Sequence, residues 1–407
     1  MDKKDVYFWL IFFVFLILIF YQIKQTDIKP YAIYSTDIGD IDNDQISEEL
    51  VNTFIRGYAE LRDNKILIAS DELNTRQDLN KDNDLNDIVL NYFDLDTKEL
   101  TNLGIDIGSG EASISNNIIA YTLSESENNE DYNQDNDLKD FVLFYYNIYT
   151  KEIINTNQQV YSRWRGSIPT ITGTSFYEHK KGISHLQSYK NIIVFSVSEL
   201  DLKQDLNLDG DIRDILIRYY NIDTKEIKIV DSNFDISRGF VIDNNIIIFT
   251  IRESKELEDY NNNGDMTDHL ITYFNIDTGK LKVTKQKMYN GDYLAFDYPY
   301  VMFLVQELNL ASDINNDGDF KDYSPLYYNI ETEQSKKFNL GLSIRTGLGK
   351  DIIAFEKNNI LKYYNINEEK TYSTLVKLDN VGRILFKEGT IYFTKGKIQY
   401  ITLTSHK

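Results

Sequence analysis

A ten-residue acidic loop occurs five times in this chain in a single register, and it constrains the fold more than any other feature. Position 1 is Asp, position 3 is Asn, and positions 7 and 10 are Asp in every copy. Position 5 is Asp except for Asn263, position 6 is Gly or Asn, and a Glu precedes each copy by six residues. Five copies in one register indicate a repeated structural unit.

The pattern is typical of a loop that wraps oxygen ligands around a hard cation. Oxygen-bearing side chains at positions 1, 3 and 5, followed by a residue that tolerates positive φ, place several oxygens around one ion. Calcium is expected, because magnesium demands a tighter octahedron and transition metals prefer imidazole or thiolate ligands. The alternative, five merely polar turns, needs only one or two Asx or Gly residues and not this register.

We therefore expect about five Ca²⁺ ions, one for each loop. The candidate metal ligands, copy by copy, are Glu72, Asp78, Asn80, Asp82, Asp84 and Asp87; Glu125, Asp131, Asn133, Asp135, Asp137 and Asp140; Glu199, Asp205, Asn207, Asp209, Asp211 and Asp214; Glu253, Asp259, Asn261, Asn263, Asp265 and Asp268; and Glu307, Asp313, Asn315, Asp317, Asp319 and Asp322.

The distribution of charge supports a bound cation. The loops and their Glu residues hold 24 of the 64 acidic residues, and the other 40 are outnumbered by 43 Lys and Arg residues. The net charge of −21 therefore belongs to the loops. Carboxylates this dense repel one another unless something neutralises them. The acidic balance also argues against a nucleic-acid partner.

The loop resembles the front half of an EF-hand or dockerin-type calcium loop, in which a bidentate Glu follows at position 12. That Glu is absent here, so the Asp at position 10 and the upstream Glu are the expected substitutes.

The sequence around the loops predicts an all-β fold. Each Glu follows an apolar run such as NIIVFSVS, and each loop precedes another such as ILIRYYNIDTKE. These β-branched and aromatic runs, separated by Asn-Asn and Asp-Thr turns, predict antiparallel meanders. A unit of about fifty residues with four short strands predicts one β-propeller, and the YNIDTKE turn resembles those of TolB-like and related WD-repeat propellers.

We expect seven blades, with six as the alternative. Six meanders are complete, and the seventh needs a strand from the other chain end, for which Tyr31–Thr36 is the candidate. Within each blade the acidic loop joins the second strand to the third. Pairs such as Glu72 with Asp87 should therefore meet at the neck of the loop, and all five loops should lie on one rim.

One insertion departs from the repeat. Residues 161–182 carry Arg163, Trp164 and Arg165, and they join the last strand of one blade to the first strand of the next. The insertion should emerge on the face that carries the metal loops. These three residues are candidates for partner binding. The alternative is that the cationic insertion packs against the acidic rim.

The N-terminal region predicts a membrane anchor. Val6–Ile23 is apolar apart from Gln22, and as a helix it would span about 27 Å. No small-residue cleavage site follows it, so an uncleaved signal-anchor is expected, with a removed signal peptide as the alternative. The predicted organisation is a tail at residues 1–5, a transmembrane segment at 6–23, a tether with a possible closing strand at 24–54, and the propeller at 55–407.

These features predict a membrane-anchored, extracytoplasmic, calcium-stabilised propeller that binds or scaffolds a protein or glycan partner. A calcium-rich exterior suits loops that lack the strongest ligand. No Ser-His-Asp or Cys-His arrangement and no Gly-rich phosphate loop can be drawn from the spacing, so no catalytic residue is assigned. The alternative function is a hydrolase or lyase with an active site in the central channel.

Overall fold

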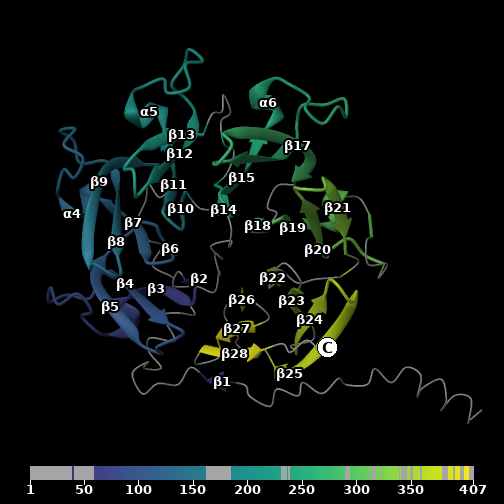
Figure 1. The fold of residues 1–407 in the computed structure, drawn as a ribbon, viewed down its shortest axis with the longest axis horizontal. Helices are drawn as coiled ribbons and strands as arrows, with labels where there is room; N and C mark the ends of the chain where they lie inside the picture. Colours follow the sequence, from purple (N-terminus) through teal and green to yellow (C-terminus); the bar gives the residue numbers. More distant parts are fainter. Residues whose placement is uncertain are drawn as a thin grey trace, which may run out of the picture.

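Four-stranded antiparallel meanders make up the sheets of this structure, a computed structural model (Figure 1). It describes residues 39–40, 59–161, 185–230, 236, 239–288, 294–310, 312–313, 318–321, 323–338, 340, 346–348, 352–357, 360–377, 384–387, 390–394 and 398–402. Within these residues there are seven four-stranded sheets.

Six sheets are each built from four consecutive strands. They are β2 (Ala59–Arg62), β3 (Lys65–Asp71), β4 (Ile88–Asp94) and β5 (Leu100–Asp106); β6 (Ala112–Ser115), β7 (Ile118–Ser124), β8 (Phe141–Asn147) and β9 (Glu152–Val160); β10 (Leu186–Tyr189), β11 (Ile192–Ser198), β12 (Ile215–Asn221) and β13 (Ile227–Ile229); β14 (Val241–Asp243), β15 (Ile246–Arg252), β16 (His269–Asn275) and β17 (Lys280–Met288); β18 (Leu294–Asp297), β19 (Tyr300–Gln306), β20 (Tyr323–Asn329) and β21 (Gln334–Lys337); and β22 (Thr346–Leu348), β23 (Ile352–Lys357), β24 (Ile360–Asn365) and β25 (Lys370–Lys377).

The seventh sheet combines strands from both ends of the chain. Its strands β26 (Ile384–Lys387), β27 (Thr390–Thr394) and β28 (Ile398–Thr402) are completed by β1 (Gly39–Asp40), which pairs antiparallel with β28. The pairing strand thus comes from the predicted 24–54 segment, but later than Tyr31–Thr36, which lies outside the described residues.

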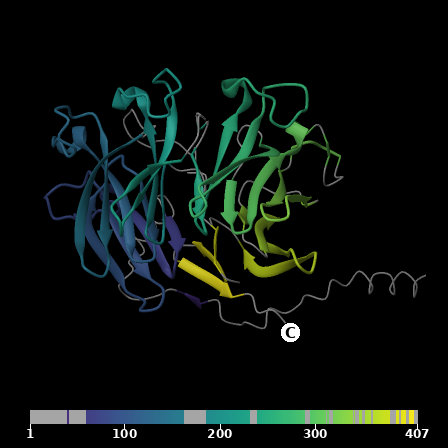
Figure 2. The ribbon, with the colours of Figure 1, turned by 45° about the horizontal axis from the view of Figure 1, so that its top comes forward.

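The sheets are arranged around a common centre, with the first strand of each of the six consecutive sheets and β26 of the seventh innermost (Figures 1 and 2). Neighbouring sheets bury each other's faces. One apolar cluster joins Leu90 of the first sheet to Tyr121 of the second, and the next joins Leu143 of the second to Phe195 of the third. Equivalent clusters continue between the following sheets as far as the sixth. Packing between repeats therefore forms the core.

Burial explains the sequence pattern of the strands. The second strands β7 and β11 are covered on both faces, so nearly all their residues are buried, and they read as continuous apolar runs. The outermost strand β21 is exposed along its length and is polar. The turn between the third and fourth strands repeats too: Asp94 Oδ1 and Asn221 Oδ1 each accept two following backbone amides.

Candidate metal-binding loops

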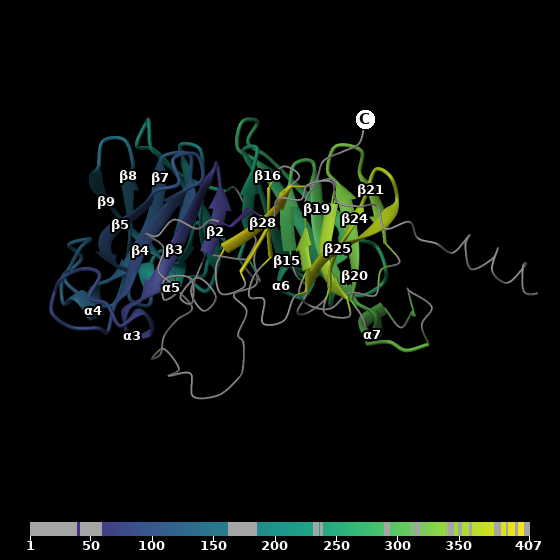
Figure 3. The same cartoon turned by 90° about the horizontal axis from the view of Figure 1, so that it is seen from below.

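Each acidic loop connects the second strand of a sheet to the third, as predicted. The loop opens with a one-turn helix that begins at the upstream Glu. These helices are α3 (Glu72–Thr75), α4 (Glu125–Asn128), α5 (Glu199–Leu202), α6 (Glu253–Glu256) and α7 (Glu307–Leu310). All five lie on the same side of the ring (Figure 3). The prediction that the loops share one rim is therefore confirmed.

Capping and strand pairing determine where the loop begins and ends. In α4 and α5 the preceding Ser accepts an amide hydrogen bond at the helix N-terminus. The backbone amide of Glu72 donates to the carbonyl of Asp87 (3.0 Å), and that of Glu199 donates to the carbonyl of Asp214 (3.0 Å). The upstream Glu and the Asp at position 10 thus pair at the neck of the loop, as expected.

The Asp at position 1 organises the backbone of the loop. In the first copy Asp78 Oδ1 accepts the amides of Lys81 (2.6 Å) and Asp82 (3.2 Å), and its Oδ2 accepts that of Asn83 (3.1 Å). Position 6 has positive φ in all five copies, from +71° at Asn136 to +102° at Gly210. These are Asx turns, in which an Asp or Asn side chain accepts amides of the residues that follow it.

The upstream Glu supports the loop from beneath. Glu72, Glu125, Glu199 and Glu253 are fully buried and Glu307 is almost so. Glu72 Oε1 accepts the amides of Leu79 and Asn80, and Glu199 Oε1 accepts those of Leu206 and Asn207. In these two copies Oε1 of the Glu thus holds the start of the loop.

The upstream Glu side chains converge with the acids at positions 7 and 10. Among the described residues, four groups place their carboxylate oxygens within 4.8 Å of one another. They are Glu72, Asp84 and Asp87; Glu125, Asp135, Asp137 and Asp140; Glu199, Asp211 and Asp214; and Glu253, Asp265 and Asp268. Each group draws on one loop and its own upstream Glu.

The amides at position 3 complete the arrangement. Asn80 Nδ2 donates to Asp87 Oδ2 (2.7 Å), and Asn207 Nδ2 donates to Asp214 Oδ2 (3.0 Å), so the Asn side chain lies beside the cluster. The Asp at position 1 is instead engaged by loop amides. In the fifth copy Asn315, Asp317 and Asp322 lie outside the described residues, as do Arg163, Trp164 and Arg165 of the insertion.

Two of these clusters contain an uncompensated oxygen. Within the described part of the chain, Glu72 Oε2 and Glu199 Oε2 are buried and have no hydrogen-bond partner. A buried carboxylate oxygen without a donor or cation is costly, and each of these two belongs to a side chain that lies in a group of carboxylates. The donor set contains only oxygens, which suits a hard divalent cation.

The charge density also affects proton binding. Burial and the charge of Asp106 raise the pKa of Asp87 to about 7, and burial together with Asp135 and Asp137 raises the pKa of Asp140 to about 7. In the absence of a cation these carboxyl groups therefore retain protons far above their ordinary range.

Three residues near these clusters were not predicted from the sequence, because they belong to the fourth strand of their sheets. They are Asp106 in the first sheet, Gln159 in the second and Lys287 in the fourth. Each follows the Asp at position 10 at the same spacing. That regularity is the one signal in the sequence that could have revealed them.

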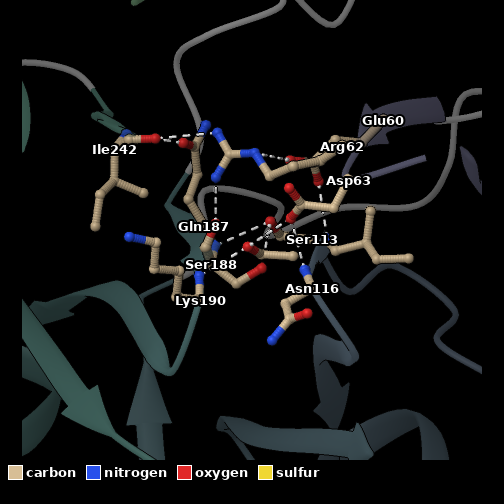
Figure 4. Close-up of polar contacts among 11 residues, drawn as sticks. Glu60, Arg62, Asp63, Ser113, Asn116, Gln187, Ser188, Lys190 and Ile242 are labelled. Atoms are coloured by element: carbon tan, nitrogen blue, oxygen red, sulfur yellow. Dashed lines mark hydrogen bonds and ion pairs between the residues drawn. The ribbon is translucent and has the colours of Figure 1, made fainter. Parts of the chain in front are cut away.

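The first strands carry a different polar network at the centre of the ring (Figure 4). Arg62 donates to the backbone carbonyls of Ser188 and Ile242, which belong to the third and fourth sheets, and its Nε lies 3.9 Å from Glu60 Oε1. Glu60 Oε2 accepts the amide of Ile114 (3.0 Å). These contacts tie the inner strands together.

The described residues on either side of the insertion lie near an acidic loop. Tyr161 donates its amide to the carbonyl of Ser196 in β11 (2.8 Å), and the ring of His185 packs edge-on against Tyr161 at 5.2 Å. His185 is buried, and its Nδ1 lies 2.9 Å from Ser196 Oγ. Because β11 leads directly into Glu199, both flanks of the insertion lie toward the rim that carries the loops.

Four-stranded meanders stacked around a centre define the class of the protein: it is a β-propeller with acidic loops on one rim. No protein-family model and no curated protein matches the chain. The chain is similar to the β-propeller domain of the trilobed protease from Pyrococcus furiosus, with 11% identity and a TM-score of 0.44 over 70% of this chain and 77% of that one.

Two further solved structures are similar at the same level. TolB from Acinetobacter baumannii shares 12% identity, with a TM-score of 0.36 over 71% of this chain and 60% of that one. A chain of the mitotic checkpoint complex shares 7% identity, with a TM-score of 0.46 over 92% of this chain and 96% of that one. Matches this distant say nothing about activity, and the fold class follows from the sheets themselves.

Proposed function

We propose that the protein is a closed seven-bladed β-propeller whose rim loops bind calcium and which acts as a binding or scaffolding module. The carboxylates of Glu72 and Glu199 carry this proposal. Each is fully buried, holds the loop through Oε1, has an Oε2 with no hydrogen-bond partner among the described residues, and belongs to a group of converging carboxylates. A divalent cation among the three carboxylates of a group would neutralise two of their charges.

Calcium fits the loops better than other cations. The donors are carboxylates and amide carbonyls on a flexible loop, and calcium accepts six to eight oxygens in irregular geometry. The loops contain no Cys, and no His occurs at any of the candidate ligand positions. Calcium would act structurally here, because an ion bound only by the folded state stabilises that state.

Calorimetric titration tests this part of the proposal. The segment 28–407, stripped of metal with chelator, should bind about four or five calcium ions and melt at a higher temperature when calcium is restored. Replacing Asp205 and Asp209 together with Asn should remove about one equivalent and spare the others, since the loops belong to separate blades. No heat and an unchanged melting temperature would contradict calcium binding.

We propose further that the face carrying the loops engages a protein or glycan partner. Exposed leucines lie on this rim: Leu73 and Leu308 are 65% exposed and Leu200 is 60% exposed, each directly after an upstream Glu. Apolar side chains next to charged loops are typical of a protein-binding face. The insertion, whose flanks reach the same rim, adds two Arg residues and a Trp in sequence.

A comparison of captured partners tests the binding role. The wild type, a Trp164→Ala, Arg165→Ala double variant and a Tyr149→Ala control would be used to capture envelope proteins, with melting temperature as the folding check. Tyr149 is 78% exposed in the turn between β8 and β9, at the opposite end of the sheet from the loop. Loss of partners by the double variant alone is expected. An unchanged partner set for a folded double variant would refute the role of the insertion.

The proposed location is the extracytoplasmic face of a membrane, with Val6–Ile23 as a signal-anchor. This rests on the apolar run in the sequence and on the suitability of calcium-rich surroundings for these loops. Among the described residues, no helix is long and apolar enough to cross a bilayer, and Val6–Ile23 lies outside them.

A further inference from the structure

The clusters differ in one residue, which the fourth strand supplies. In three sheets, a polar residue of the fourth strand is paired in register with the third-strand residue that lies two positions after the last Asp of the loop. Val89 pairs with Asp106, Val142 with Gln159, and Leu270 with Lys287. These three partners therefore occupy equivalent places beside three metal loops, and they carry a negative charge, no charge and a positive charge.

Each partner is held close to its loop. In the first sheet Asp106 Oδ1 accepts the amide of Ile88 (3.0 Å), the residue after Asp87, so a further carboxylate stands at the neck of the loop. In the second sheet Gln159 donates its amide to Asp140 Oδ1. The number of negative charges around a calcium site sets much of its affinity, so these loops should not be equivalent.

In the fourth sheet the cationic partner contacts the cluster directly. Lys287 Nζ forms an ion pair with Asp268 Oδ1, and the Asp268 side chain is only 1% exposed. Asp268 Oδ2 accepts amides from Asn261 (2.8 Å) and Asn263 (2.7 Å). Both oxygens of this buried carboxylate thus have partners within the protein.

The fourth loop also departs from the motif at this same point. Its position 5 is Asn263, where the other four copies have Asp. The substitution removes one carboxylate and supplies the second amide donor to Asp268. Asn263 and Lys287 therefore both make the charge around the fourth loop less negative, and they occur in the same sheet.

We propose that the Lys287 ammonium takes the place of a divalent cation in the fourth loop, so that this blade is held together without calcium while the first and third loops depend on it. This inference rests on the proposed calcium binding and ranks the sites. A tethered ammonium neutralises one carboxylate and donates hydrogen bonds, but it brings less charge than calcium and competes with it for Asp268. The fourth site should be the weakest of the four described.

Reciprocal substitutions test the inference. Lys287→Gln installs the residue found beside the second loop and should strengthen calcium binding at the fourth loop about tenfold or more, seen as an added tight equivalent in a calorimetric titration. Gln159→Lys should weaken binding at the second loop by a similar factor. Lys282 lies on the same strand as Lys287, and Lys282→Gln, which removes an exposed ion pair with Glu333, is the matched control. It should change calcium binding at neither loop.

Melting in chelator gives a second measurement. Lys287→Gln should melt below the wild type without calcium, and calcium should restore its melting temperature, whereas Lys282→Gln should follow the wild type under both conditions. If the wild type binds calcium but the number and strength of its sites are the same in both reciprocal variants, the role of Lys287 is refuted and calcium binding stands. If neither the wild type nor any variant binds calcium, both proposals fall.

Discussion

Replacing Glu199 with Gln should have opposite effects on stability with and without calcium. The side chain is fully buried, and its Oε1 accepts two loop amides that a glutamine oxygen can also accept. Its Oε2 has no hydrogen-bond partner among the described residues, and one oxygen of the Glu199 carboxylate lies within 4.8 Å of carboxylate oxygens of Asp211 and Asp214. The substitution therefore removes a charge and keeps the scaffold of the loop.

The size of the effect follows from these contacts. Two like charges 4.8 Å apart repel by about 3 kcal/mol at an effective dielectric constant of about 20. Asp211 is exposed, so water screens part of this repulsion, and we expect Glu199→Gln to stabilise the metal-free protein by about 1–2 kcal/mol. Calcium at about 100 times its dissociation constant stabilises the wild type by about 2.7 kcal/mol through this site. The variant loses that gain but keeps the relief from repulsion, so in calcium it should be less stable than the wild type by about 0.7–1.7 kcal/mol.

Thermal melts of the wild type and the variant, each in chelator and in excess calcium, measure both effects. At about 2 °C per kcal/mol the variant should melt about 2–4 °C higher in chelator and about 1–3 °C lower in calcium. Glu226→Gln, an exposed position paired with Lys228, is the control and should have little effect in either condition. Equal destabilisation of the Glu199 variant in both conditions would show that Glu199 acts through hydrogen bonds alone.

Three further predictions concern pH, the backbone and the membrane. The folded-state pKa of about 7 at Asp87 and Asp140 exceeds the ordinary value of 3.8, so the metal-free folded state holds protons that the unfolded state has released. The stability that these two groups contribute should therefore be fully present below about pH 4 and be lost as pH rises through 7, and a urea midpoint of the metal-free protein that increases from about pH 5 to about pH 8 would contradict this. Gly210→Ala should lower the free energy of unfolding by about 1–3 kcal/mol, because φ there is +102°. No atom lies within 4 Å of the added methyl, so the cost comes from the backbone conformation and not from a clash. Asn83→Gly, at φ +80°, should be nearly neutral in the same denaturation assay. The full-length protein should stay in the membrane fraction after alkaline carbonate extraction, and a soluble product beginning near residue 25 would show that Val6–Ile23 is cleaved.

Local sequence was enough to predict the strands, the four-stranded unit and the position of the loops. Apolar runs such as β7 and β11 are buried on both faces, so their composition alone identifies them. The pairing of Glu72 with Asp87 follows from the loop joining two antiparallel neighbours. These features depend on residues close in sequence, whose spacing fixes their geometry.

Contacts that depend on strand register could not be predicted in the same way. Lys287 reaches Asp268 only because β17 pairs with β16 through an irregularity between Leu270 and Thr272, and similar shifts occur in the first two sheets. A shift of one residue would turn the side chain to the other face. Arg62 likewise reaches Ser188 and Ile242 from a distant sheet, which no local pattern encodes.

The most direct test of calcium binding is a crystal structure of the soluble segment grown in calcium, with anomalous diffraction data to identify the ion. We predict an anomalous peak about 2.3–2.6 Å from oxygens of Glu72, Asp84 and Asp87, and an equivalent peak among Glu199, Asp211 and Asp214. Ordered loops that show only water at these two places under saturating calcium would contradict the proposed function.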